Sequence, residues 1–67
     1  MSKFIIYGLN QRQDIAILAD DFETDTDMGR VKFMDSDENI IAWFKLSNIQ
    51  GFVNMTRLEE LAQEVNK

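Results

Sequence analysis

The segment VKFMDSDENIIAWFK, residues 31–45, decides the fold of this chain. Residues 31–34 alternate between the two faces of a strand, with Val31 and Phe33 on one face. Residues 40–45 are rich in β-branched and aromatic side chains, which are typical of strands. Between them, residues 35–39 carry short polar side chains that bond their own backbone and tolerate unusual dihedral angles. The segment therefore predicts an antiparallel hairpin.

Outside the hairpin, three short apolar runs also have the composition of strands. We expect these strands at residues 4–7, 15–19 and 49–53. Residues 15–19 also contain good helix formers, but the run is too short for a stable isolated helix. Gly51 predicts a bulge or a close approach to the backbone. Residues 8–11 are expected to form a turn, and residues 20–29 a polar, acidic connection.

The periodicity changes near the C-terminus. Thr56 and Glu59 match a capping box, in which the hydroxyl bonds the amide three residues on and the carboxylate reaches back. Apolar residues then recur at helical spacing, which predicts a helix over residues 56–66 with one apolar stripe packed on the sheet. The stripe consists of Leu58, Leu61, Ala62 and Val65, and the residues expected to face water are Glu59, Glu60 and Glu64.

These elements predict an α+β fold: a small antiparallel sheet or barrel of four to five strands with one C-terminal helix. The chain has 67 residues, which is the length of one small domain, so we expect residues 1–67 to fold as a single unit. Strands such as 40–45 are apolar on both faces. This pattern indicates a closed barrel, a covering helix or a partner chain.

The composition argues against catalysis. The chain contains no cysteine and no histidine. This excludes disulfides, thiolate and imidazole chemistry and ordinary zinc sites. Paired carboxylates would need a cleft that so short a chain has little volume to form. We therefore expect no enzyme, no catalytic residues, no cofactor and no resident metal.

The apolar runs of the chain are far shorter than the roughly 20 residues that span a bilayer. The first residues also lack the apolar stretch of a signal peptide. We therefore expect a cytoplasmic protein that does not bind membranes. Direct binding of nucleic acid is not expected either, because the formal net charge is −5 and seven basic residues are thinly spread.

The acidic residues are concentrated in two segments. Eight of the twelve are Asp20, Asp21, Glu23, Asp25 and Asp27 in the first segment, and Asp35, Asp37 and Glu38 in the second. If both segments lie on one side of the sheet, they form a negative patch that would recognise a basic surface. The alternative is that the carboxylates are simply solvated, as surface charges usually are.

The second acidic segment also begins like a calcium-binding loop. Residues 35–39 match its D-x-D-x-N start. However, Ile40 stands where the loop needs glycine, and Leu46 stands where it needs a bidentate glutamate. Only weak, incidental binding of divalent cations is compatible with this sequence.

Trp43 and Phe44 are neighbours on a predicted strand, so their side chains point to opposite faces. If Phe44 fills the core, Trp43 is exposed as a protein-binding hot spot or a homodimer contact. We therefore expect a small non-catalytic protein-interaction module, of the kind found among accessory or phage-type regulators and inhibitors. The alternative is an acidic mimic of nucleic acid that inhibits a DNA- or RNA-binding protein.

Overall fold

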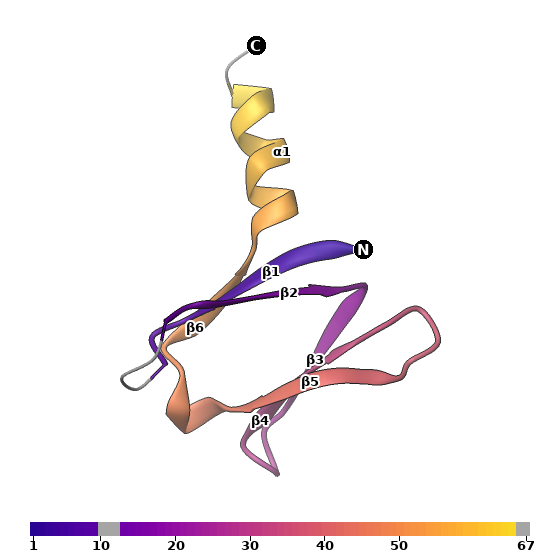
Figure 1. Cartoon of the computed structure of the whole chain (residues 1–67), viewed down its shortest axis with the longest axis vertical. Coiled ribbons are helices and arrows are strands. Elements are labelled where there is room, and N and C mark those ends of the chain that lie inside the picture. Colours follow the sequence, from indigo (N-terminus) through magenta and orange to yellow (C-terminus); the bar gives the residue numbers. More distant parts are fainter. Residues whose placement is uncertain (10–12, 66–67) are drawn as a thin grey trace.

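The computed structural model describes residues 1–9 and 13–65 (Figure 1). Within these residues the chain forms six strands, one short 3-10 turn and one α-helix. In chain order they are β1 (Ser2–Tyr7), β2 (Ile15–Ala19), β3 (Asp21–Asp25), β4 (Arg30–Met34), β5 (Ile40–Lys45), η1 (Leu46–Asn48), β6 (Gly51–Asn54) and α1 (Met55–Val65). This is an α+β fold with antiparallel sheets, as the sequence predicts.

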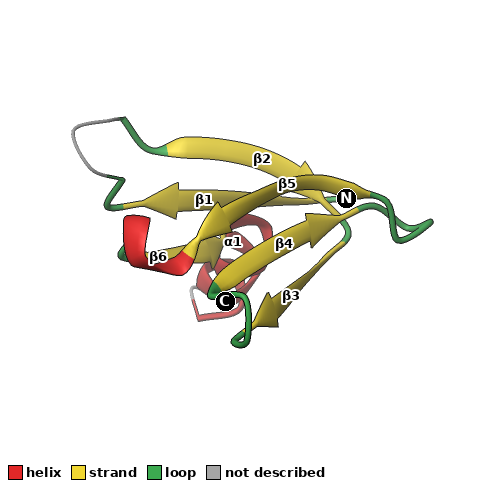
Figure 2. Cartoon of the chain, turned by 90° about the horizontal axis from the view of Figure 1, so that it is seen from below, coloured by secondary structure: helices red, strands yellow, loops and turns green. Residues whose placement is uncertain are grey.

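The strands form two three-stranded antiparallel sheets. Sheet A has the order β2-β1-β6, and sheet B has the order β3-β4-β5. The chain crosses between them after β2, where the Asp20 N–H donates to the Met34 carbonyl oxygen at 2.9 Å. It returns through η1, where the Leu46 N–H donates to the Gly29 carbonyl oxygen at 2.9 Å. The strands of the two sheets run obliquely to each other (Figure 2), so the fold resembles a small, partly open barrel.

The core lies between the two sheets. Phe4 and Ile6 enter it from β1, and Val31 and Phe33 enter it from β4; all four are fully or almost fully buried. All five phenylalanines of the chain belong to one network of ring contacts: Phe4, Phe22, Phe33, Phe44 and Phe52. Phe33 is its centre, because its ring lies 5.2–6.3 Å from each of the other four.

Strand β3 is the main departure from the predicted elements. Residues 20–29 were expected to form a connection, but Asp21–Asp25 pair with β4 along its whole length. The reason is Phe22, which lies opposite Phe33 and joins the aromatic network. Strand β3 is otherwise polar, and it is held by its pairing along the edge of β4 and by the ring contacts of Phe22. The structure therefore has six strands where four to five were expected.

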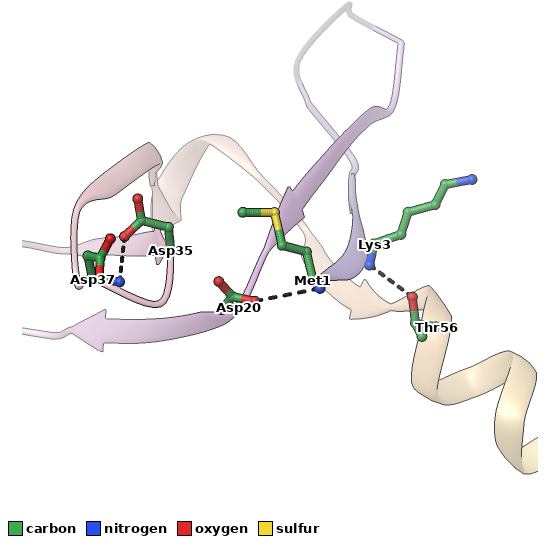
Figure 3. A network of polar contacts seen from close by, with 6 residues as sticks. All are labelled: Met1, Lys3, Asp20, Asp35, Asp37 and Thr56. Carbon is green, nitrogen blue, oxygen red and sulfur yellow. Dashed lines mark hydrogen bonds and ion pairs between the residues drawn. The ribbon is translucent and has the colours of Figure 1, made fainter.

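The predicted capping box is wrong. The residue that caps α1 is Asn54, whose Oδ1 accepts a hydrogen bond from the Arg57 N–H at 3.0 Å. Thr56 lies inside the first turn, and its Oγ1 accepts a hydrogen bond from the Lys3 N–H of β1 at 2.9 Å (Figure 3). The hydroxyl therefore fastens the helix to sheet A and does not close its own N-terminus.

The prediction that α1 lies on the sheet is also wrong. The helix projects away from both sheets, on the side of sheet A opposite to sheet B (Figure 1). Leu58 is 50% exposed and Leu61 is 40% exposed, and Ala62 is exposed as well. The physical reason is that the inner faces of the two sheets bury each other, which leaves no inner face for the helix to cover.

Two glycine predictions are partly testable. Residues 10 and 11 of the expected turn lie outside the described residues, and Gly8 has the positive φ of 75° that a turn glycine often adopts. Gly51 lies opposite Tyr7, and a Cβ at Gly51 would lie 2.6 Å from the phenolic oxygen. The close approach expected at Gly51 is therefore that of the Tyr7 ring.

No helix in the described segments is long and apolar enough to cross a membrane.

We predict that Phe33→Ala unfolds the protein at room temperature. Removing a fully buried phenylalanine costs about 3–5 kcal/mol, and one core of this size rarely supplies more than about 3–5 kcal/mol in total. Circular dichroism during urea denaturation measures the effect. The control is Phe22→Ala on the edge strand β3, which removes a partly exposed ring and should cost clearly less. Equal losses for the two variants would contradict the central place of Phe33.

Candidate functional site

The candidate site is the outer face of sheet B. Val31 and Phe33 point into the core, so Arg30, Lys32 and Met34 point outward. Residues directly opposite each other on neighbouring antiparallel strands share a face. The outer face therefore has three cross-strand rows: Asp25–Arg30–Lys45, Glu23–Lys32–Trp43 and Asp21–Met34–Ile40.

Both acidic segments meet at one end of this face. A hollow of about 590 Å³ lies between the start of β3, the end of β4 and the hairpin turn. We call it the acidic hollow; its lining is Asp20, Asp21, Phe22, Glu23, Lys32, Met34, Asp35, Ser36, Glu38 and Ile40. Five of the eight predicted acidic residues thus surround a single depression. The sequence left open whether the two segments share a side, and the fold brings them together.

The other three acidic residues lie outside the lining. Asp37 belongs to the same hairpin turn, with its side chain exposed. Asp25 ends β3, and its Oδ1 accepts a hydrogen bond from the Met28 N–H at 3.1 Å. Asp27 is exposed in the turn that follows. Asp25 and Asp27 therefore sit at the opposite end of β3 from the hollow, and the eight carboxylates do not form one continuous patch.

Asp35 holds the hairpin turn in shape. Its Oδ1 accepts hydrogen bonds from the backbone N–H groups of Asn39 and Asp37, each at 2.9 Å (Figure 3 shows the bond to Asp37). The Asn39 side-chain amide adds a longer bond at 3.4 Å. These donors, with the Asn39 backbone N–H foremost, hold the pKa of the Asp35 carboxyl below its ordinary value. Glu38 takes the left-handed conformation that the turn requires, with φ of 65°.

Asp20 also has a local partner. Its Oδ1 lies 3.6 Å from the N-terminal ammonium group of Met1 (Figure 3). This contact is partly exposed, so its contribution to stability is small. Asp20 and Asp35 are thus engaged within the chain. Asp21 also has a local contact, because its Oδ1 accepts a hydrogen bond from the Phe22 N–H at 2.8 Å. The lining also has exposed carboxylates at Asp21, Glu23 and Glu38.

Trp43 lies on the same outer face, beside the hollow. The side chain is 55% exposed, and its cross-strand partner Lys32 lines the hollow. The Arg30 guanidinium carbon lies 5.5 Å from the centroid of the indole ring, at cation–π distance. Phe44, the neighbour of Trp43, packs against the core. The sequence prediction that the two rings point in opposite directions is therefore confirmed.

Three basic residues on this face were not predicted as part of the site. Arg30, Lys32 and Lys45 stand in the rows between β3 and β5, so the face is mixed in charge and not uniformly negative. Arg30 and Lys32 follow from the alternation of β4, because they must face away from Val31 and Phe33. Lys45 lies on β5, two residues from Trp43 on the same face. Sequence reasoning missed them because β3, the strand opposite, was taken for a loop.

The site combines carboxylates, basic side chains and an exposed aromatic ring. In residues 1–9 and 13–65, no three carboxylates lie close enough together to hold a metal ion. The strongest polar contacts of the turn carboxylate Asp35 are to backbone N–H groups, which serve the turn itself. What the face offers is a negatively lined depression next to an exposed aromatic ring. No protein family model, curated protein or solved structure matches this chain.

We predict that Asp35→Ala lowers the thermal midpoint at neutral pH. A lowered pKa means that the folded state favours the ionised carboxylate, so this stabilisation is present above the ordinary pKa of 3.8 and is lost as the pH falls through the folded-state value. The difference in thermal midpoint between the wild type and Asp35→Ala should therefore become smaller at acid pH. Thermal melts across the pH range measure it.

Asp37→Ala is the matched control, because its backbone N–H makes the contact to Asp35 and survives the substitution. A gap that stays constant down to strongly acid pH would contradict the role given to the Asp35 carboxylate.

Proposed function

We propose that this chain is a small, non-catalytic, cytoplasmic protein-interaction module that binds a protein with a basic surface through the outer face of sheet B. In this proposal Trp43 is the apolar anchor, and the carboxylates of the acidic hollow select and orient the partner. The module acts as an accessory regulator or inhibitor of that partner.

The observation that carries the proposal is the position of Trp43. The Trp43 side chain is exposed over half its surface and lies outside the aromatic core that the five phenylalanines form. Tryptophan is enriched among the residues that dominate binding energy at protein interfaces. The adjoining carboxylates supply long-range attraction, which raises association rates and excludes acidic competitors.

The second candidate is an acidic mimic of nucleic acid. It is favoured by β3, on which Asp21, Glu23 and Asp25 share one face at a spacing of about 6–7 Å. The basic residues opposite, Lys32 and Arg30, weigh against it because they interrupt the negative field. The two functions differ in whether binding depends on Trp43 or on charge alone.

We predict that a partner captured from a lysate of the source cells is lost with two variants. One is Trp43→Ala, and the other is the triple substitution Asp21→Asn, Glu23→Gln and Glu38→Gln. Each should weaken binding at least about tenfold, since truncating an anchor or removing three interfacial charges costs more than about 1.4 kcal/mol. Biolayer interferometry with the purified partner, in steps of rising salt, measures the affinities.

The matched control is Asp14→Asn with Asp25→Asn and Asp27→Asn, which removes the same net charge at positions that neither line the hollow nor lie on α1. This variant should bind like the wild type. If it loses as much affinity as the hollow variant, only net charge matters and the proposed site is wrong. If Trp43→Ala binds normally while affinity falls steeply with salt, the mimic function holds in its place.

A further inference from the structure

The outer face of sheet A is a second surface that no other element of the described chain covers. Ile6 points into the core, so its neighbours Ile5 and Tyr7 point outward, together with their cross-strand partners. The described residues of this face, which we call the apolar face, are Lys3, Ile5, Tyr7, Ala16, Leu18, Gly51 and Val53. It carries one charge, Lys3. Leu18, on the edge strand β2, is 59% exposed, whereas Ile5 on the central strand β1 is half-buried.

A second apolar surface lies next to it. Helix α1 rises on the side of sheet A that bears the apolar face (Figure 1). Its exposed residues Leu58, Leu61 and Ala62 form an apolar stripe with no partner among the described residues. The chain therefore presents an apolar sheet face and an apolar helix stripe at once, joined at the Lys3–Thr56 hydrogen bond.

The chain exposes more surface than a compact monomer of its mass. The accessible surface of the chain is 5064 Å², whereas a monomer of 7.8 kDa is expected to expose about 4,400 Å². The radius of gyration is 13.0 Å, against about 11 Å for a compact chain of this length. The projecting helix thus leaves an excess of about 660 Å² of accessible surface, and a stable interface buries roughly 800 Å² on each partner.

The dimensions of the two surfaces also agree. The 11 residues of α1 make a helix about 16 Å long, and the six residues of β1 span about 20 Å. One helix thus covers the length of the central strand of sheet A. In a two-fold dimer each contact occurs twice, so both helices and both apolar faces would be covered.

Charge favours a second copy seated on this face. The acidic hollow lies on sheet B, beyond the core, so copies that meet through sheet A keep their hollows apart. The apolar face carries only Lys3, whereas Glu59 and Glu64 flank the apolar stripe of α1. A helix from a second copy would bring carboxylates toward Lys3, which makes no ion pair among the described residues.

We propose that two copies of this chain form a symmetric dimer in which α1 of each copy lies across the apolar face of the other. The dimer leaves both Trp43 faces exposed and pointing outward. It is therefore bivalent toward any partner that binds there.

Sedimentation velocity at roughly 100 µM protein tests the proposal, since a dimer of micromolar affinity is saturated at that concentration. The wild type should have twice the 7.8 kDa mass of one chain. Two double variants should have the mass of one chain: Leu58→Lys with Leu61→Lys on the helix, and Ala16→Glu with Leu18→Glu on the sheet. All four positions are exposed in the single chain, so circular dichroism should show both variants folded. Trp43→Ala should remain dimeric.

Mixing the two monomeric variants tests the arrangement itself. In the mixed dimer, the lysines of one helix meet the glutamates of the other chain's sheet, and the second helix–sheet contact is wild type. The mixture should therefore recover the dimer mass. Failure to recover it would overturn the helix-on-sheet arrangement. A wild type that has the mass of one chain at this concentration would overturn the dimer. The apolar face would then be covered by the chain's own helix or by a different partner.

Discussion

The network of five phenylalanine rings is the interaction on which the rest of the structure depends. It joins Phe4 and Phe52 of sheet A to Phe22, Phe33 and Phe44 of sheet B. With no cysteine in the chain, no disulfide can share this task. Because the two sheets pack against each other through these rings, their inner faces are buried and no part of them remains for the helix to cover. The helix is therefore left outside the core, and both outer faces remain available.

The two outer faces differ in chemistry, and the difference comes from strand alternation. In β4 the core residues Val31 and Phe33 force Arg30 and Lys32 outward, where they meet the carboxylates of β3. In β1 the core residues Phe4 and Ile6 leave Ile5 and Tyr7 outward, so that face is apolar. One small fold thus separates a charged surface with an exposed tryptophan from a surface suited to association. The proposed partner site and the proposed dimer contact do not compete for the same residues.

The sequence predicted the elements with strong periodicity and missed those that depend on distant contacts. The hairpin of residues 31–45 and the opposite orientations of Trp43 and Phe44 follow from local alternation alone. Strand β3 was missed because its carboxylates resemble a loop, and only pairing with β4 orders it. The helix was predicted almost to its ends, but its cap and its packing were not. The cap depends on the end of β6, where Asn54 precedes the helix. The packing depends on the two sheets, whose inner faces are already buried against each other. The acidic hollow was visible in the sequence only as two separate segments.

Native-state hydrogen exchange, at a protein concentration far below that of dimer formation, tests most directly whether the phenylalanine network is the core and the helix lies outside it. Amides of the central strands β1 and β4 should exchange only through global unfolding, because those strands are paired on both sides. Amides of α1 beyond its first turn should exchange far earlier, through local opening. Protection in α1 equal to that of β1 and β4 would contradict the structure's central feature, because it would place the helix inside the cooperative core.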